Sequence, residues 1–243
     1  MAPGALSPVA SSIAGSRRTD AATTIVGLTG GVAAGKTTIA DELARLLEDE
    51  HGLSAVVVST DGFLFPTARL AAMGILDRKG FPESYDVDAV HRFLDDVRAG
   101  RTATVPVYDH LVYDIVDAET SVERVDVLLF EGVNALRFGD RLDRTIYLHA
   151  EEPHLRDWFT VRAFGFREAA RHSHSPFFEP WIDASDDDFR SMADAAWDLV
   201  NRPNLVECIE PMRDTADIVI VKAGDHTITS VEFRTGVDVD GRG

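Results

Sequence analysis

Five short runs of apolar and β-branched residues are spaced along the chain, and their lengths are typical of β-strands. They cover residues 23–29, 54–60, 125–132, 144–150 and 216–223. None alternates regularly between apolar and polar positions, which favours strands that are buried on both faces, as in a parallel sheet. We therefore predict five buried strands.

Segments with the periodicity of amphipathic helices separate these runs. After the first run, Ile39, Leu43 and Leu47 fall on one helix face. The same periodicity indicates helices over residues 86–98, 151–171 and about 186–201. Strands that alternate with helices predict an α/β fold, with a mostly parallel sheet and helices on both faces. Ligands of such sheets bind beyond the carboxyl ends of the strands.

The link between the first strand and the first helix contains a phosphate-binding pattern. GLTGGVAAGKTT, residues 27–38, holds the complete Gly-x-x-x-x-Gly-Lys-Thr sequence. Its glycines let backbone N–H groups surround phosphates, its lysine pairs with the β and γ phosphates, and its threonine hydroxyl binds Mg²⁺. We therefore predict a three-layer P-loop NTPase fold that binds ATP with Mg²⁺. The predicted nucleotide-binding residues are Gly30, Gly31, Val32, Ala33, Ala34, Gly35, Lys36, Thr37 and Thr38, of which Thr37 is also a metal ligand.

The two ends of the chain differ from the rest in composition. Residues 1–22 are rich in Ala, Ser, Gly and Pro, which predicts a disordered N-terminal tail. The last eight residues, GVDVDGRG, predict a similarly loose end. Residues 23–243 are then expected to form a single P-loop domain, because their number is ordinary for one α/β domain.

Charge and cysteine content limit the partners and the compartment. A net charge of −17 disfavours nucleic acids and membrane surfaces, which are polyanions. No apolar run approaches the roughly 18 residues that indicate a membrane span. The single cysteine, Cys208, excludes an internal disulfide and fits a reducing cytoplasm. We expect a cytoplasmic protein that binds ATP and a small molecule, and the candidate oligomer, a homodimer, is left open.

Three classes of P-loop protein compete. A GTPase switch needs an Asn-Lys-x-Asp guanine reader, and VKAGD, the nearest stretch, lacks the Asn. A transporter or motor ATPase needs a coupling signature, which is not evident. A small-molecule kinase needs a carboxylate near the γ-phosphate and a lid of arginines. Asp61 and Glu131 follow the second and third strands, so the third class is favoured.

The lid candidate is the helix predicted over residues 151–171. Leu155, Phe159, Arg162 and Phe166 share one stripe of it, and an arginine within an apolar stripe is costly to desolvate without an anion. A phosphate would be such an anion. The alternative is an arginine whose stem packs while its head reaches water. Glu131 is predicted to hold Mg²⁺ or its water shell.

Two further stretches resemble one family. The segment 59–90, which includes KGFPESYD, and VPVYDHLVYDIV at residues 105–116 are similar to bacterial type I pantothenate kinases. VDVLLFEGVNAL and the block 197–234 resemble the same family, so the resemblance spans about residues 24–234. Taken alone, VYDHLVY indicates an exposed β-hairpin with alternating aromatic residues.

The resemblance implies transfer of the ATP γ-phosphate to the primary hydroxyl of pantothenate, the opening step of coenzyme A synthesis. It implies that Asp61 is the base, and that Lys36 and Arg162 stabilise charge on the transferring group. The residues that it implies for pantothenate are Tyr108, His110, Tyr113, Asn204, Phe178 and Phe159, the last in place of a tyrosine of the family. The alternatives are another kinase of the superfamily, with a nucleoside or sugar as acceptor, and a nucleotide-binding regulator without catalysis.

Overall fold

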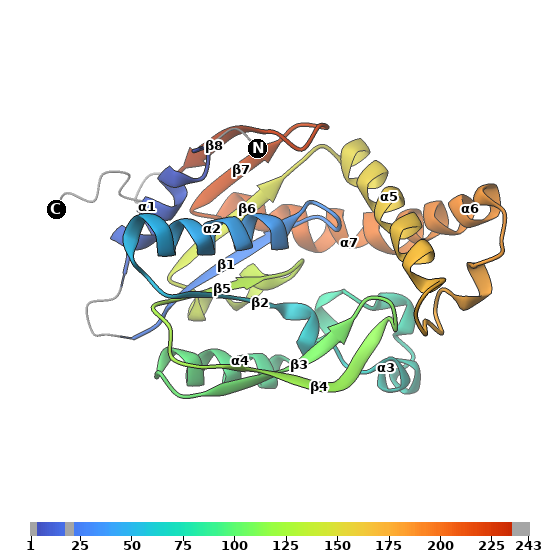
Figure 1. Cartoon of the computed structure of the whole chain (residues 1–243), viewed down its shortest axis with the longest axis horizontal. Coiled ribbons are helices and arrows are strands. Elements are labelled where there is room, and N and C mark those ends of the chain that lie inside the picture. The colour runs from blue at the N-terminus through green and yellow to red at the C-terminus, as the bar shows by residue number, and fades with distance from the viewer. Residues whose placement is uncertain (1–3, 18–21, 235–243) are drawn as a thin grey trace.

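The computed structural model describes residues 4–17 and 22–234. Its centre is a six-stranded sheet in the order β2-β5-β1-β6-β7-β8 (Figure 1). The first five of these strands in that order are mutually parallel, and only β8 runs antiparallel, beside β7. The strands are β1 (Thr24–Gly30), β2 (Ala55–Ser59), β5 (Val127–Glu131), β6 (Arg144–His149), β7 (Ile218–Lys222) and β8 (Ile228–Phe233). The five predicted strands and the mostly parallel sheet are confirmed.

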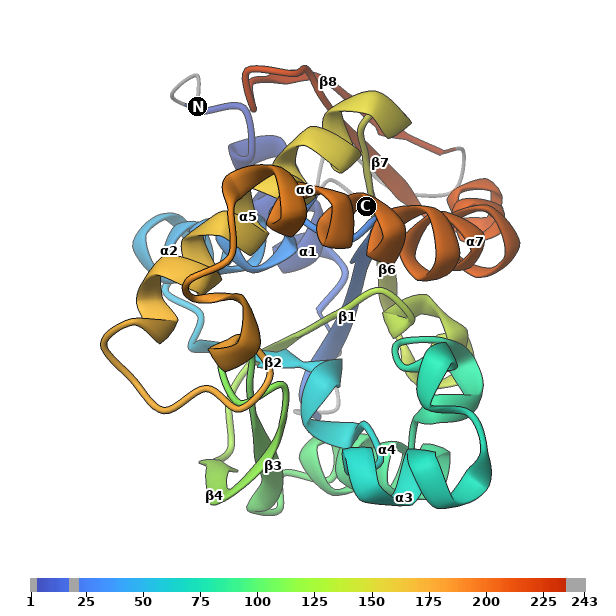
Figure 2. The same cartoon turned by 90° about the vertical axis from the view of Figure 1, so that its right-hand side faces the viewer.

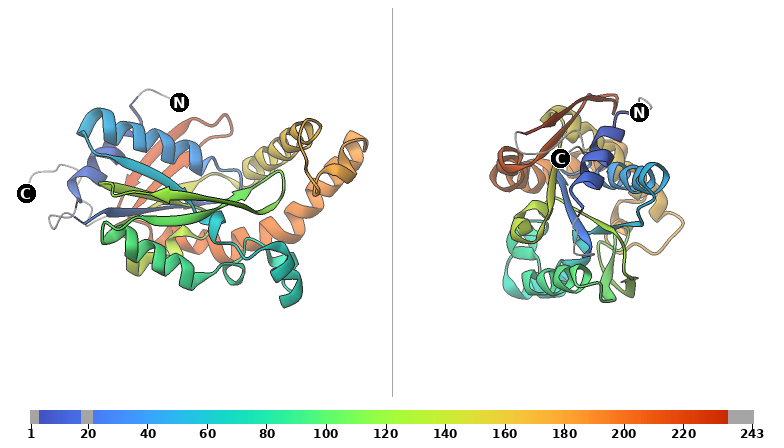
Figure 3. Two further views of the ribbon diagram at one scale, coloured as in Figure 1. Left: turned by 60° about the horizontal axis from the view of Figure 1, so that its bottom comes forward. Right: turned by 90° about the vertical axis from the view of Figure 1, so that its left-hand side faces the viewer.

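The sheet is covered by helices on both faces, as predicted. Helix α2 (Lys36–His51) lies on one side of it and α4 (Val87–Arg98) on the other (Figure 3). Every residue of β1 is buried, and the faces of α2 and α4 that point inward carry buried leucines, such as Leu43 and Leu94. The side chain of Asp86 accepts a hydrogen bond from the backbone N–H of Ala89, which caps α4 where its apolar pattern begins.

One predicted loose segment is a helix instead. Helix α1 (Ser7–Gly15) packs on α2, so the predicted disordered tail over residues 1–22 is wrong at these positions. Val9, Ala10 and Ile13 are fully buried, and burial of these side chains offsets the entropy of ordering a short segment. The alanine- and serine-rich composition hides this one apolar face. Of the predicted loose ends, residues 1–3, 18–21 and 236–243 lie outside the described residues.

A separate β-hairpin stands beside the sheet. Strands β3 (Ala103–Asp109) and β4 (Asp114–Val122) pair antiparallel, and the turn between them spans residues 110–113. A short helix, α3 (Thr67–Met73), lies near this turn, where the backbone N–H of Thr67 donates to the Asp114 carboxylate. The hairpin that the sequence alone indicated therefore forms.

Two helices project beyond the sheet. Helix α5 (Glu152–Ala170) and helix α6 (Asp186–Ala196) lie next to each other, across from the hairpin and α3 (Figure 2). The chain continues from α6 through a π-helical segment (Trp197–Asn201), α7 (Arg202–Asn204) and a second π-helical segment (Leu205–Ile209). The predicted helix over 151–171 is confirmed, whereas the one predicted over 186–201 extends further. Within the described residues, no helix is both long enough and apolar enough to cross a membrane.

Candidate active site

A cavity of about 470 Å³ lies beyond the carboxyl ends of β1, β2 and β5. One end is formed by the phosphate loop, and the other lies between the hairpin turn, α5 and the helical run after α6. Residues predicted for the phosphate end that line the cavity are Val32, Ala33, Gly35, Lys36, Thr37, Thr38, Asp61, Glu131 and Arg162. All six residues predicted for the acceptor line it as well: Tyr108, His110, Tyr113, Phe159, Phe178 and Asn204. The predicted site residues are therefore brought together, although their roles stay predictions.

The phosphate loop has the backbone that its glycines predict. Gly35, directly before α2, has a φ of 87°, in the left-handed region that favours glycine. A Cβ on Gly30 would lie 2.5 Å from the carbonyl oxygen of Leu148, so only glycine fits there. Gly30, Gly31 and Ala34 are not among the lining residues. Their carbonyls accept hydrogen bonds from lysines instead. The Nζ of Lys36 donates to the carbonyls of Gly30 and Gly31 at 3.2 and 3.0 Å, and the Nζ of Lys222 donates to that of Ala34.

Two carboxylates meet at the phosphate end because the strands that carry them are in register. Ser59, the last residue of β2, lies opposite Glu131, the last residue of β5, and Asp61 follows in the next turn. The hydroxyl of Thr37 donates to Glu131 Oε1 at 3.0 Å. Burial raises the pKa of Glu131, the Lys36 ammonium opposes this shift, and the nearby Asp61 charge adds to it. The pKa of Lys36 is lowered by burial, against the pull of both carboxylates.

Asp61, His110 and Arg162 form a chain across the cavity. Nε2 of His110 lies 3.9 Å from Asp61 Oδ2, and Nη2 of Arg162 lies 3.1 Å from the same His110 nitrogen. Burial lowers the pKa of His110, and the Asp61 charge partly offsets this effect. A neutral imidazole without a proton on Nε2 can accept the hydrogen bond from Arg162. The same nitrogen then has no proton for Asp61, so the histidine is bonded to the lid arginine and lies near the carboxylate without a hydrogen bond to it. Arg162 also lies over the Phe166 ring, at 5.1 Å from its centroid.

Lys79 was not predicted as a site residue, yet it lines the acceptor end. Its Nζ donates to Thr67 Oγ1 at 2.9 Å and to the Tyr113 carbonyl at 2.5 Å. The same ammonium lies 5.0 Å from the centre of the Tyr108 ring and 4.2 Å from that of Tyr113. Burial lowers the pKa of Lys79, although Asp114 and Asp61 attract its charge. The Lys79 ammonium thus lies beside the rings of Tyr108 and Tyr113, where it can contact an anionic or polar acceptor.

Gly80, which follows Lys79 in the KGFPESYD stretch, is held by two asparagines. Asn134 and Asn204 both donate through their side-chain amides to the Gly80 carbonyl, at 2.7 and 2.9 Å. The Oδ1 of Asn204 is buried and has no hydrogen-bond partner among the described residues. Asn204 therefore uses its amide N–H within the protein, and its side-chain oxygen stays without a partner among the described residues. Asn201, which was not predicted, also lines the cavity.

The third lysine of the chain binds the phosphate loop from behind. Nζ of Lys222 donates to the Ala34 carbonyl at 2.7 Å, and it lies 5.0 Å from the centre of the Trp158 ring. The chain has only three lysines, Lys36, Lys79 and Lys222. Lys36 and Lys79 line the cavity, and Lys222 supports its phosphate loop. The scarcity of lysine in an acidic chain was the sequence signal that could have pointed to Lys79 and Lys222.

The geometry of the cavity defines a class of protein. A phosphate loop, two carboxylates and an arginine on a projecting helix surround one cavity, which is the arrangement of a P-loop phosphotransferase. A model of the Phosphoribulokinase / Uridine kinase family matches residues 25–152. The chain belongs to this family and is an ATP-dependent kinase.

The relatives narrow this class. A pantothenate kinase of Nitrobacter hamburgensis is 40% identical over 226 residues, which cover 86% of this chain and 71% of that protein. A pantothenate kinase of Streptococcus equi subsp. zooepidemicus is 36% identical, covering 86% of this chain and 72% of the relative. Among solved structures, D-glycerate 3-kinase of Cryptococcus neoformans superposes with a TM-score of 0.60 at 15% identity, covering 88% of this chain and 90% of that one. That likeness shows the fold alone.

Proposed function

We propose that this kinase transfers the γ-phosphate of ATP to pantothenate and forms 4′-phosphopantothenate. The observation that carries the proposal is the acceptor end of the cavity. It is built from KGFPESYD and VPVYDHLVYDIV, the two stretches that are similar to pantothenate kinases. An acid with hydroxyls and an amide needs several oriented polar partners within an otherwise apolar pocket. Lys79, Tyr108, His110, Tyr113 and Asn204 supply such partners, and Phe159 and Phe178 supply apolar surface.

The roles of the residues at the phosphate end follow from their chemistry. The primary hydroxyl oxygen of the acceptor attacks the γ-phosphorus, the bond from this phosphorus to the bridging oxygen of ADP breaks, and the hydroxyl proton goes to Asp61. Lys36 and Arg162 offset the negative charge on the transferring group. His110 can release Arg162 toward the phosphate as the acceptor arrives, since the two are joined by a single hydrogen bond.

Mg²⁺ fits the residues at this end. Within the described ranges, no group of three or more His, Cys, Asp or Glu side chains could hold a metal alone. Mg²⁺ is commonly held by one or two oxygen ligands of the protein together with phosphate oxygens and water. The Thr37 hydroxyl and the Glu131 carboxylate, 3.0 Å apart, are such ligands. The ion would neutralise phosphate charge, and Glu131, whose pKa is raised by burial, would be held ionised by it.

The test is a measurement of ATP consumption with pantothenate, uridine, cytidine, fructose and glycerate as acceptors, each with and without Mg²⁺. We expect pantothenate to be the best acceptor and the turnover to require Mg²⁺. A clear preference for a nucleoside or sugar, with pantothenate inert, would favour another small-molecule kinase of the same family. A homodimer and a cytoplasmic location also remain proposals, and sedimentation of the purified chain tests the first.

A further inference from the structure

The loop that follows α5 is tied to the hairpin turn by two contacts that the chemistry above does not use. Ser175 is 3% exposed, and its hydroxyl donates to the carbonyl of Leu111 in the turn. The ring of Phe177 stacks on the ring of Tyr113, with centroids 4.2 Å apart and planes 21° from parallel. Both contacts join residues more than 60 positions apart, so they fix one segment against another.

The turn that receives these contacts carries two residues of the acceptor end, His110 and Tyr113. Tyr113 has a φ of 61°, in the left-handed region that bulky residues rarely adopt. Such a conformation persists only where the surroundings hold it. Its N–H donates to the Asp109 carbonyl at 2.7 Å, and its carbonyl accepts from Lys79. Those bonds fix the backbone, whereas the ring is placed by what packs against it.

Phe177 is the ring that packs on Tyr113 from outside the hairpin, and it also lines the cavity. It is partly exposed and contacts Phe178 edge-on, with ring centroids 4.9 Å apart. Ser175 sits at the base of the same loop, where its hydroxyl also accepts from the N–H of Phe178 at 3.3 Å. The loop therefore brings its serine to Leu111 and its phenylalanine to Tyr113 as one unit.

We infer that Ser175 and Phe177 are positioning residues for the acceptor: they strap the loop after α5 onto the hairpin turn and thereby fix the Tyr113 ring and His110 at the cavity. Ser175 is not among the cavity-lining residues, whereas Phe177 lines the cavity itself, so Ser175→Ala is the variant that separates positioning from direct contact with the acceptor. The inference rests on the proposed function only for the identity of the acceptor. The strap couples the lid to the hairpin, so it affects the acceptor end and leaves the phosphate loop untouched.

The first measurement does not depend on any substrate. The chain has four tyrosines, so ¹³C-tyrosine labelling gives four sets of ring signals, and Tyr113→Phe assigns one of them. Stacking on Phe177 should shift the Tyr113 ring signals, and Phe177→Leu should move them toward the values of an unstacked ring, while Phe177→Trp should keep them shifted. Unmoved Tyr113 signals in Phe177→Leu would overturn the strap, whatever the acceptor is.

The second measurement is the KM of each substrate. Ser175→Ala and Phe177→Leu should each raise the KM for pantothenate about tenfold, which corresponds to the loss of one well-placed contact, and the KM for ATP should stay constant. Ser173→Ala is the matched control, because its hydroxyl lies in the same loop and, within the part of the chain that the structure describes, bonds to the Ala169 carbonyl at its own end of α5. Phe177→Trp, which keeps an aromatic ring at this position, should have the same KM for pantothenate as the unmodified chain.

The outcomes separate this inference from the proposed function. If the unmodified chain does not phosphorylate pantothenate, the proposed function fails, and the acceptor found in the screen replaces pantothenate in the KM measurement. A KM for the acceptor that is equal in Ser175→Ala and Ser173→Ala, or a parallel rise in the KM for ATP, would overturn the positioning role.

Discussion

At the scale of single residues, Asp61 is the charge that the two ends of the cavity share. Its carboxylate lies 3.9 Å from His110 and contributes to the pKa of Lys36 on the phosphate side. On the acceptor side, burial raises the pKa of Tyr113, and the charge of Asp61 adds to the rise. A carboxylate whose charge is felt at both ends is the candidate that we propose as the general base, which must stand between the γ-phosphate and the acceptor hydroxyl.

Asp61→Asn should therefore abolish most turnover while ATP still binds. Lys36 and Thr37 keep their contacts in this variant, because neither is hydrogen-bonded to Asp61. Loss of a general base typically costs about 10²- to 10⁴-fold in rate, or about 3 to 5 kcal/mol of barrier. Steady-state kcat, together with ATP binding by calorimetry, checks this. Turnover close to that of the unmodified enzyme would place the base elsewhere, with Glu131 the next candidate.

Phe159 tests the shape of the acceptor end. It lines the cavity, and its ring packs against Trp197 with centroids 5.8 Å apart. If it stands where the resemblance implies a tyrosine, Phe159→Tyr adds a hydrogen bond to pantothenate of about 1 kcal/mol. The KM for pantothenate should then fall about fivefold.

Phe164→Tyr is the control for this change. Phe164 lies on the same helix but packs on Phe189, and it is not among the cavity-lining residues. A KM for pantothenate that is unchanged in Phe159→Tyr, or that falls equally in both variants, would mean that the acceptor end is built differently.

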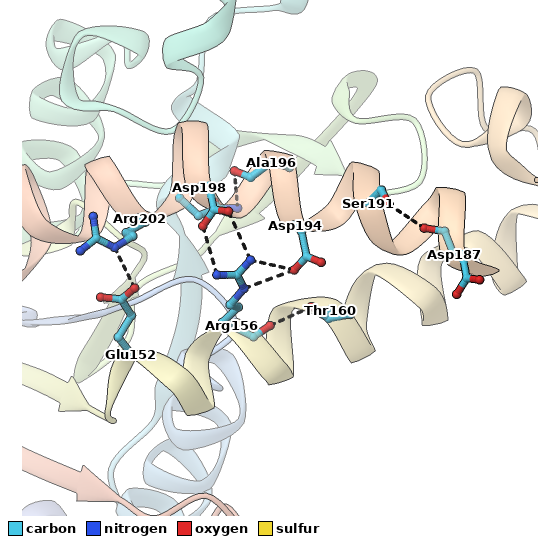
Figure 4. A network of polar contacts seen from close by, with 10 residues as sticks. Glu152, Arg156, Thr160, Asp187, Ser191, Asp194, Ala196, Asp198 and Arg202 are labelled. Carbon is cyan, nitrogen blue, oxygen red and sulfur yellow. Dashed lines mark hydrogen bonds and ion pairs between the residues drawn. The ribbon is translucent and has the colours of Figure 1, made fainter. Parts of the chain in front are cut away.

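At the scale of elements, the position of α5 decides where Arg162 points. Figure 4 shows ion pairs that join α5 to the helical run from α6 onward. Arg156 pairs with Asp194 at 3.0 Å and with Asp198 at 3.1 Å, and Arg202 pairs with Glu152 at 2.9 Å. These groups are partly exposed, so each pair contributes little to stability, about 0 to 1 kcal/mol. We expect their consequence to be geometric, because they join α5, which carries Arg162, to the helical run that lines the other side of the cavity.

Arg156→Ala should accordingly affect catalysis more than folding. We expect kcat to fall about tenfold, since displacement of a charge-stabilising group by about 1 Å can cost up to about 10²-fold. The thermal midpoint should change by only a few degrees. Arg45→Ala is the control, because Arg45 is also partly exposed and, among the described residues, pairs with Glu42 and Asp49 of its own helix α2. Equal kcat values for the two variants would show that the ion pairs of Arg156 do not position Arg162.

At the scale of the whole molecule, two features govern stability and approach of the substrate. The chain carries a net charge of −17, yet all three of its lysines gather at one cavity or behind its loop. A local cluster of cations in an acidic molecule favours polyphosphate binding there and disfavours it elsewhere. The second feature is α1, which packs on α2, the helix whose first residue is Lys36.

Ile13→Ala measures how far α1 belongs to the folded unit. Ile13 is fully buried, and truncation of such a side chain to alanine costs about 2 to 5 kcal/mol of the free energy of unfolding. Ser11→Ala, at an exposed position of the same helix, should cost little. Urea unfolding followed by circular dichroism compares the two. Equal unfolding free energies would mean that α1 contributes nothing to the stability of the fold.

Local patterns along the chain were enough to predict the central strands, the helices between them and the phosphate end of the site. The five central strands, the phosphate loop and the convergence of Asp61 with Glu131 all followed from local patterns. Parallel strands end at one edge of their sheet, so acids that follow two such strands must approach each other. Arg162 was found because a charged residue within an apolar stripe calls for a partner.

Features that depend on contacts between distant segments could be known only from the folded chain. Helix α1 is ordered by its packing on α2, and the edge strand β8 by its pairing with β7, because neither has a strong pattern of its own. Lys79 could not be assigned before its ammonium was seen against Tyr113, and Ser175 before its hydroxyl was seen on Leu111. A local pattern reports which face of a segment is apolar. The partner of that face is fixed when the chain folds and the packing energy of distant segments is gained.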